Sequence, residues 1–238
     1  MKITILGCGI IGVVNAYFLA KQGHDVTVIE QERDVCLKTS NANGCQLSFN
    51  HCHPWFDANV AINICKAFFG RDSYLTINNL FKDDFFAWFI KLLPNFFKNE
   101  QIAQNLLKLA YQSRKNLAQI LADEDIDFNY KNNGILHFFR SEKKFQKAIK
   151  FSQVNKRFNS NFEVLDSKQI LQIEPNLRED KFCGGILFKD DASGDVLKFA
   201  RALARICRDK YQVKFEFNTK IDKIIAQPAA PVYCMHQM

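Results

Sequence analysis

The sequence predicts an α/β fold that opens with a βαβ unit, and three patterns near the N-terminus support this prediction. Residues 2–6 alternate in the way of a buried strand, and residues 26–29 are a β-branched run of the kind found in parallel sheets. Between them, small and apolar residues recur at the spacing of one helix face: Val13, Ala16, Tyr17 and Ala20. Gly23 follows, and glycine readily adopts the left-handed conformation that ends a helix.

After this unit the pattern becomes irregular and then turns helical. Residues 34–60 are rich in Ser, Asn, Gly, His and Cys and predict an ordered loop, which at such a length is usually functional. A strongly apolar, aromatic segment at 80–93 ends at Pro94. An amphipathic helix is expected next, with the following residues on its buried face: Leu106, Leu109, Ala110, Ser113, Leu117, Ile120 and Leu121.

The second half of the chain alternates between strands and helices. Residues 127–130 and 135–139 predict the two strands of a hairpin around Asn132-Asn133-Gly134, because Asn-Gly favours tight hairpin turns. The remaining elements are expected in this order: a charged helix at 141–157, a strand at 185–188, a turn at 190–194, a helix at 196–208 and a strand at 213–217.

Size, charge and cysteine usage exclude several classes of protein. The chain has 238 residues, 47% of them hydrophobic and 24% charged, as in a globular protein with a sizeable core. The net charge is +7, but the basic residues form no run or stripe, so no nucleic-acid partner is expected. None of the eight cysteines forms a Cys-x-x-Cys pair, and His51-Cys52-His53 has no second ligand pair at zinc spacing. We therefore expect reduced thiols and no metal.

The N-terminus favours a protein that stays in the cytoplasm. The apolar run before Gly7 is too short for a secretory signal and leads directly into a glycine cluster. No apolar stretch reaches the length of about twenty residues that a membrane-spanning helix needs.

Residues 7–12 form a Gly-x-Gly-x-x-Gly motif between the first predicted strand and the first predicted helix. In that context Gly7 allows a tight turn, Gly9 allows a pyrophosphate to approach the backbone, and Gly12 allows close packing of helix and strand. The helix then begins at Ile10 and Ile11, whose backbone N–H groups and the helix dipole favour phosphate. This motif predicts a dinucleotide site.

Glu30 ends the second predicted strand, eighteen positions after Gly12. A carboxylate there accepts hydrogen bonds from the hydroxyls of an adenosine ribose and repels a 2′-phosphate. NADP is therefore disfavoured, whereas FAD and NAD both remain compatible with Glu30.

The loop after Glu30 favours FAD. Residues 39–48 are small and polar, with hydroxyls and amides suited to a second phosphate or a flavin ring. Their pattern Thr-Ser-x-Ala-Asn-x-x-Gln-Leu-Ser, followed by Pro54-Trp55, resembles the FAD loop of the D-amino acid dehydrogenases, within the glycine oxidase and D-amino acid oxidase superfamily. The resemblance extends over residues 1–225 through these further segments: 134–140, 174–177, 184–187, 193–195 and 213–219.

The resemblance implies a Rossmann-like FAD-binding βαβ domain interleaved with an α+β substrate domain. The implied ranges are 1–60 and 190–225 for the FAD-binding domain and 61–189 for the substrate domain. It also implies that these loop residues contact FAD: Thr39, Ser40, Asn43, Gln46 and Leu47. The family has Ala-Gly where this chain has Gly44-Cys45, so a glycine suited to positive φ is replaced by cysteine.

The implied reaction is the oxidative deamination of a D-amino acid such as D-alanine to a 2-oxo acid and ammonia, with hydride transfer to flavin. Electrons would pass on to a quinone or another carrier. No catalytic residue is assigned; His137, Arg140 and Arg178 are candidate substrate or ring contacts, although each is more simply a structural or surface residue. The aromatic residues within 80–97 allow peripheral contact with the inner membrane, but packing into the substrate domain is the simpler expectation.

Two alternatives remain open. Family members continue well beyond residue 225, so the C-terminal part of the fold is expected to be missing, with 226–238 as a non-family tail. The chain would then be an inactive remnant with an unpaired sheet edge. An NAD-linked dehydrogenase would instead place further βα units directly after Glu30.

Overall fold

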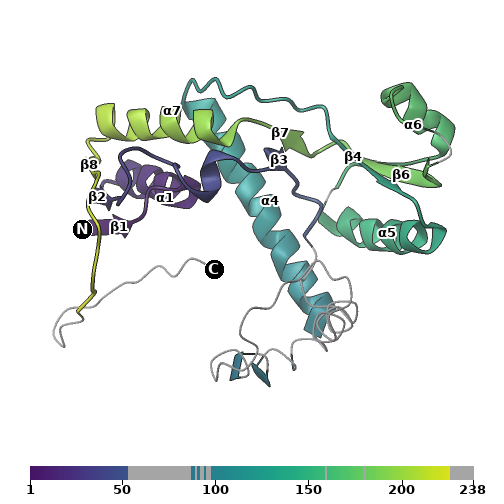
Figure 1. Cartoon of the computed structure of the whole chain (residues 1–238), viewed down its shortest axis with the longest axis horizontal. Coiled ribbons are helices and arrows are strands. Elements are labelled where there is room, and N and C mark those ends of the chain that lie inside the picture. The colour runs from purple at the N-terminus through teal and green to yellow at the C-terminus, as the bar shows by residue number, and fades with distance from the viewer. Residues whose placement is uncertain are drawn as a thin grey trace. The chain divides into compact units, whose positions relative to one another are not determined.

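The computed structural model describes residues 1–52, 87–88, 90–91, 94, 98–158, 160–178 and 181–225. These residues form two compact units (Figure 1). The first comprises Met1–Cys45, Glu124–Tyr130 and the described part of Gly194–Met238, and the second comprises the described parts of Gln46–Asp123 and Lys131–Ser193. Most of the aromatic segment at 80–97, with its expected membrane contact, and the tail at 226–238 lie outside the described residues.

The first unit is built on a parallel sheet, as the N-terminal pattern predicts. Its strands are β1 (Lys2–Leu6), β2 (Asp25–Ile29) and β8 (Lys214–Glu216), in the order β1-β2-β8. Helices α1 (Ile10–Lys21) and α7 (Val196–Asp209) pack against each other in this unit (Figure 1). The α/β fold class and the opening βαβ unit are therefore confirmed.

Burial follows the helical periodicity of the sequence. The α1 face expected to be buried is buried, and α1 ends where Gly23, at φ +84°, donates its N–H to the carbonyl of Ala20. Five residues of α7 form its buried face: Phe199, Ala200, Leu203, Ala204 and Cys207. These two faces form the core of the first unit together with Val26 and Val28 of β2.

A buried carboxylate ties the short segment Glu124–Tyr130 to the rest of the first unit. The side chain of Glu124 is 6% exposed. It accepts hydrogen bonds from three groups: Tyr17 Oη at 3.1 Å, Lys210 Nζ at 2.8 and 2.9 Å, and Tyr211 Oη at 2.9 Å. Burial alone would raise the pKa of Glu124, but these donors outweigh burial and hold the pKa below its ordinary value.

The second unit is an α+β assembly around an antiparallel sheet. Its strands β4 (Ile135–Phe139), β5 (Phe162–Leu165) and β6 (Gly184–Phe188) lie in the order β4-β6-β5. A small second sheet pairs β3 (Gln46–Leu47) with β7 (Ala192–Ser193). The helices are α4 (Asn99–Asp123), α5 (Glu142–Asn155) and α6 (Ser167–Ile173). Short 3-10 turns occur at Thr39–Asn41 in the first unit and at Lys156–Phe158 in the second.

A buried polar network fixes the segment after β3 in the second unit. Asn50 is 1% exposed, and its side-chain amide donates to Asp191 Oδ1 at 2.8 Å. Tyr111 Oη donates to Asn50 Oδ1 at 2.6 Å, and the Asn155 amide donates to the carbonyl of Asn50 at 3.1 Å. Burial raises the pKa of Asp191 to about 6, even though the hydrogen bonds from Asn50 lower it.

One expected strand is absent, and the buried face of one expected helix differs in part. Residues 127–130 form no strand, because Phe128 packs against Phe199 with ring centroids 5.0 Å apart, while Lys131 bridges to Ser193. The strand at 135–139 pairs with β6 instead. On α4, Leu109 is 64% exposed, and the buried positions are Ala103, Leu107 and Ile120. The expected face of this helix is therefore right at Ile120 and wrong at Leu109 and Ser113, which are exposed, because several registers of a Leu-rich helix give an amphipathic pattern.

The boundaries of the two units differ from the domain boundaries expected from the sequence. The first unit ends at Cys45 rather than at 60 and resumes at Gly194 rather than at 190, because β3 and β7 pair with each other. The domain ranges from the sequence stay a prediction.

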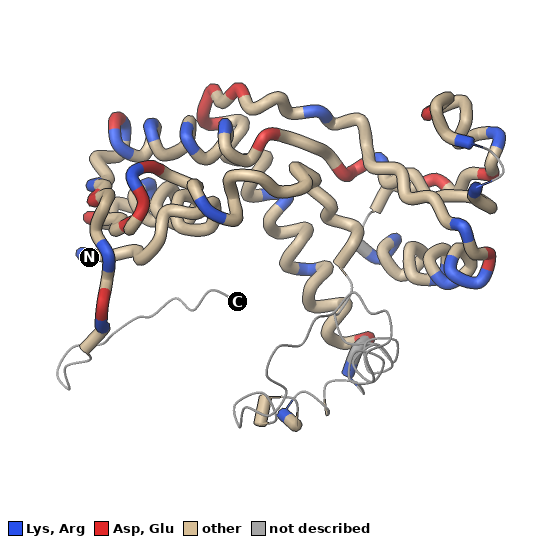
Figure 2. The backbone as a smooth tube through the Cα atoms, viewed as in Figure 1, with Lys and Arg blue, Asp and Glu red and all other residues tan. Residues whose placement is uncertain are grey.

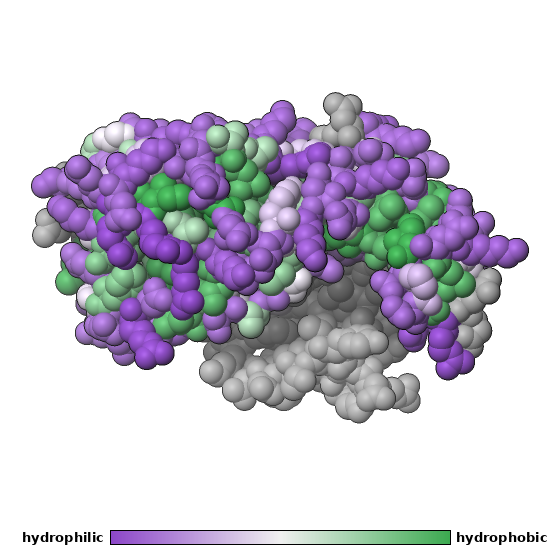
Figure 3. Space-filling view, turned by 90° about the horizontal axis from the view of Figure 1, so that it is seen from above, coloured by the Kyte–Doolittle hydropathy of each residue, from purple (hydrophilic) through white to green (hydrophobic). Residues whose placement is uncertain are grey.

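The surface of the described residues matches the composition. Lys and Arg are distributed over the helices and loops of both units (Figure 2). The face in Figure 3 is largely hydrophilic, with smaller apolar areas between the polar residues. Among the described residues no helix combines the length and apolarity needed to cross a membrane.

We predict that Glu124→Gln lowers the free energy of unfolding by about 1–2 kcal/mol at pH 7, a modest value because Lys210 is 53% exposed. The folded-state pKa of Glu124 is depressed, so its contribution is present above the ordinary glutamate pKa of 4.5 and is lost as the pH falls below it. Urea unfolding of both proteins between pH 7 and pH 3 measures the difference. Asp125→Asn, at an exposed neighbouring position, is the control. A difference that stays constant with pH would contradict the prediction.

Candidate dinucleotide-binding site

The glycine turn between β1 and α1 has the geometry that the motif predicts. Gly7 has φ +96°, and its N–H donates to the carbonyl of Ile29 at 2.8 Å. A Cβ on Gly12 would lie 2.1 Å from the Gly7 carbonyl oxygen, so only glycine allows α1 to approach β1 this closely. A Cβ on Gly9 would meet only Ser40 Oγ, at 3.5 Å, so the backbone at Gly9 faces open space. The roles expected of the three glycines match these positions.

A cavity of about 680 Å³ lies at this turn, at the carboxyl ends of the parallel strands. Most of the predicted cofactor residues line it: Gly7, Gly9, Ile10, Ile11, Glu30, Thr39, Ser40 and Asn43. Gly12 lies behind the turn in α1. Gln46 and Leu47 form β3 in the second unit, so the cavity of the first unit does not include them.

The cavity is also lined by residues that the sequence motif did not predict: Leu6, Ile29, Gln31, Glu32, Cys36, Leu37, Lys38, Thr219 and Ile221. Thr219 was recognisable in principle, because it follows a predicted parallel strand and strand ends of this kind border the ligand crevice. Its N–H donates to the carbonyl of Glu30 at 2.9 Å, which joins this strand end to that of β2. Lys38 and Leu37 carry no comparable signal.

Side chains of the following loop satisfy part of the helix N-terminus. Gly9 precedes α1 without a side chain to cap it. The N–H of Ile10 donates instead to Ser40 Oγ at 3.3 Å, so the hydroxyl accepts a long hydrogen bond. An anionic oxygen is a stronger acceptor at this position than a hydroxyl, because it also interacts with the positive end of the helix dipole.

Glu30 follows β2 and is anchored at the edge of the cavity. Its Oε2 accepts from the N–H of Cys8 at 2.6 Å, and its Oε1 accepts from the N–H of Glu32 at 3.0 Å. Each carboxylate oxygen can accept more than one hydrogen bond, so both remain able to accept from a ligand hydroxyl. The carboxylate is thus fixed by backbone donors and still lines the cavity.

Ion pairs and buried thiols stabilise the loop around the cavity. Arg201 of α7 pairs with Asp34 at 2.9 Å, and Lys38 pairs with Glu32 at 3.2 Å. Burial, followed by the neighbouring Cys36 thiol, raises the pKa of Cys8 to about 12. Cys8 and Cys36 are therefore neutral packing residues and not thiolate nucleophiles.

Cys45 occupies the position where the resembling family has glycine. Its φ is +52°, in the left-handed region that favours glycine. Asn43 Oδ1 accepts from the N–H of Cys45 at 2.8 Å, and the carbonyl of Cys45 accepts from the N–H of Gly194 at 3.0 Å. These two bonds hold the residue in a conformation that its side chain disfavours.

The other candidate residues lie outside this cavity. His137 is on β4 in the second unit, and Arg140 follows that strand directly. Arg178 is exposed in the segment after α6. Within the described part of the chain, no group of three His, Cys, Asp or Glu side chains is arranged to hold a metal ion.

A parallel sheet, a glycine turn that opens a helix and a carboxylate at the next strand end define a dinucleotide-binding α/β protein. The model of the DAO family, described as FAD dependent oxidoreductase, matches residues 2–234. The chain belongs to this family, whose cofactor is FAD.

Curated relatives are similar over most of this chain. The D-amino acid dehydrogenase of Rhizobium rhizogenes is 36% identical over 209 residues, which cover 86% of this chain and 50% of that protein. The D-amino acid dehydrogenase of Allorhizobium ampelinum is 32% identical, over 94% of this chain and 54% of that protein. The chain therefore spans about half the length of the curated relatives it matches.

Solved structures show the same fold. Glycine oxidase from Geobacillus kaustophilus aligns with a TM-score of 0.63 and 17% identity, over 92% of this chain and 46% of that one. The FAD-bound L-α-glycerophosphate oxidase from Mycoplasma pneumoniae aligns with a TM-score of 0.57 and 18% identity, over 95% of this chain and 47% of that one. At these identities the likeness is one of fold.

We predict that Gly12→Ala lowers the free energy of unfolding of the first unit by about 3 kcal/mol, because its Cβ overlaps the Gly7 carbonyl and α1 must move off β1. Urea unfolding monitored by circular dichroism measures the loss. Gly44→Ala is the matched control, since no atom lies within 4 Å of its added Cβ. Equal effects of the two substitutions would contradict the packing argument.

We predict that Cys45→Gly raises the free energy of unfolding by about 0.5–1 kcal/mol. A residue with a side chain adopts this left-handed conformation at a cost of about 1–2 kcal/mol, and glycine adopts it without that cost. The greater freedom of glycine in the unfolded chain offsets part of the resulting gain in stability. Cys52 lies outside the left-handed region, so Cys52→Gly is expected to destabilise. Thermal unfolding of the two variants distinguishes these signs, and destabilisation by both would refute the strain at Cys45.

Proposed function

We propose that the first unit binds FAD in its cavity and that the protein serves the oxidation of a D-amino acid. One observation supports FAD binding most directly: the open Gly9 backbone, the first residues of α1 and the Glu30 carboxylate all line the same cavity. The family match supports the same cofactor. The substrate is inferred from the D-amino acid dehydrogenases that the chain resembles at 32–36% identity.

The start of α1 would hold the diphosphate. Gly9 has no side chain to exclude a phosphate from the backbone, and Ile10 and Ile11 begin the helix there. The Ser40 hydroxyl, which accepts from Ile10 in this structure, would turn to donate a hydrogen bond to a phosphate oxygen. Thr39 and Asn43 line the same cavity and add polar groups beside it.

Glu30 would accept hydrogen bonds from the adenosine ribose. Its position is fixed by two backbone amides, so it needs little reorganisation to bind a hydroxyl pair. Glu32 adds a second carboxylate to the cavity wall, and together they disfavour a 2′-phosphate.

When bound, FAD supplies the hydride acceptor for oxidation of the amino acid at Cα, and hydrolysis of the imine product gives a 2-oxo acid and ammonia. The described residues contribute binding and orientation of the cofactor. Electron transfer to a quinone or another carrier, and contact with a membrane, are further parts of this proposal. The second candidate is a family member that binds FAD without catalysing this reaction.

NAD-linked dehydrogenation has less support. Residues 34–52 contain a 3-10 turn and the two-residue β3, where such an enzyme would have another βα unit. The family match is to FAD-dependent proteins over residues 2–234.

The cofactor proposal predicts that FAD binding quenches flavin fluorescence and that Gly9→Ala weakens this binding at least about tenfold. Gly9 has φ −71° and ψ 178°, which alanine adopts freely, so the fold should tolerate the change while the methyl group obstructs the diphosphate. Riboflavin, which lacks the diphosphate, is the control ligand and should not distinguish the variant from the parent. Equal FAD affinity in both proteins would overturn the proposed diphosphate site.

D-alanine-dependent dye reduction by the FAD-loaded chain tests the reaction. Turnover with D-alanine and not with L-alanine supports the substrate proposal. Bound FAD without turnover favours the inactive form.

A further inference from the structure

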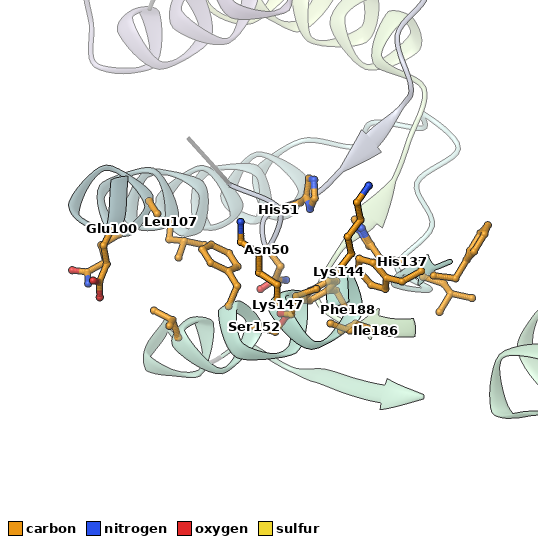
Figure 4. Close-up of a pocket in the computed structure, with 18 residues that line it drawn as sticks. Asn50, His51, Glu100, Leu107, His137, Lys144, Lys147, Ser152, Ile186 and Phe188 are labelled. Atoms are coloured by element: carbon orange, nitrogen blue, oxygen red, sulfur yellow. The ribbon is translucent and has the colours of Figure 1, made fainter. Parts of the chain in front are cut away.

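We propose that a cavity in the second unit binds an organic carboxylate with an apolar body. The cavity has a volume of about 780 Å³ and lies among α4, β4, α5 and β6 (Figure 4). All its lining residues belong to the second unit. The site is therefore separate from the dinucleotide cavity of the first unit, and it does not rest on FAD binding.

Most of the cavity wall is apolar. The apolar side chains come from all four elements: Ala103, Leu107, Leu136, Phe138, Phe139, Ala148, Phe151, Val154, Ile186 and Phe188. Such a wall favours the hydrocarbon part of a ligand, because transfer of apolar surface out of water is favourable by about 25 cal/mol per Å². The volume accommodates a small aromatic or aliphatic acid.

The charged groups of the wall favour an anion at one end. Lys144 and Lys147 of α5 are three residues apart, so their ammonium groups project from the same side of the helix. Among the described residues that line the cavity, Glu100 is the one carboxylate, and it lies at the far end from Lys144 and His137 (Figure 4). A lone carboxylate is therefore matched better than an amino acid zwitterion, whose ammonium group would lie beside the lysines.

Two neutral histidines, His51 and His137, also line the cavity. The rings of His51 and His137 have centroids 4.8 Å apart. Burial, followed by the neighbouring His51, lowers the pKa of His137 to about 4, and burial also lowers that of His51. His137 Nε2 is buried and has no hydrogen-bond partner among the described residues. A ligand carboxylate oxygen in the cavity offers this nitrogen an acceptor, which a purely apolar ligand does not.

Three ligands of nearly equal shape test the proposal: 4-phenylbutyrate, 4-phenylbutanol and 4-phenylbutylamine. Calorimetric titration of the full chain at pH 7 should show the acid binding about tenfold more tightly than the alcohol and the amine, as expected for two exposed cations acting together. Equal affinity for the three ligands, or no binding of the acid, would overturn the proposal. The titration is then repeated with FAD present. The preference for the acid should be the same with and without FAD, so a failure of the FAD proposal would not change this result.

Variants of α5 locate the anion. Lys144→Gln combined with Lys147→Gln should remove the preference for the acid, with the affinity for the alcohol unchanged. Lys143→Gln combined with Lys150→Gln is the matched control, because both lysines are exposed on the same helix and do not line the cavity. Histidine NMR signals should shift with the acid in the control and in the parent. An equal loss of preference in both double variants would show a general charge effect and refute the site.

Discussion

The close approach of Gly12 to the Gly7 carbonyl is the constraint on which the first unit depends. No side chain fits between them, so α1 starts directly above the end of β1. This contact sets the direction of the helix and leaves the Gly9 backbone open to the cavity. It also brings Cys8 next to Glu30, where the Cys8 N–H donates to the carboxylate at 2.6 Å. One packing contact between backbone atoms thus positions both the amides proposed to bind phosphate and the carboxylate proposed to bind the ribose.

The same arrangement holds most of the cavity wall in a position suited to a ligand, so that few side chains need to move on binding. Glu30 is held by backbone donors on both oxygens, and the β8 strand end is joined to it through Thr219. Ser40 is the adaptable member, because a hydroxyl can accept from Ile10 or donate to a phosphate without a change of backbone. A rigid acid and an adaptable hydroxyl together suit a ligand with both sugar and phosphate groups.

The parts of the structure that local rules determine could be predicted from the sequence. The glycine spacing, the α1 face and the position of Glu30 each depend on residues close in the chain, and the structure brings them together as expected. The Glu124 network could not be predicted from local sequence patterns, because it joins Tyr17 to a residue 107 positions away. The hairpin at 127–139 failed for the same reason: Phe128 packs against Phe199, and this distant contact outweighs the local turn preference of Asn-Gly.

The two cavities differ in the origin of their polar groups, and this difference also decides which of them a sequence reveals. In the first cavity the backbone itself supplies donors, which requires glycine at fixed spacing and leaves a motif. In the second, Lys144 and His137 supply the polar groups within apolar walls that come from residues 50–188. Many apolar residue types can form such walls, and their spacing in the sequence is not fixed, so they leave no recognisable motif. Because side chains supply these groups, a substitution of Lys144 should change ligand preference without changing the fold, whereas a substitution of Gly12 forces α1 off β1 and changes the backbone and the site together.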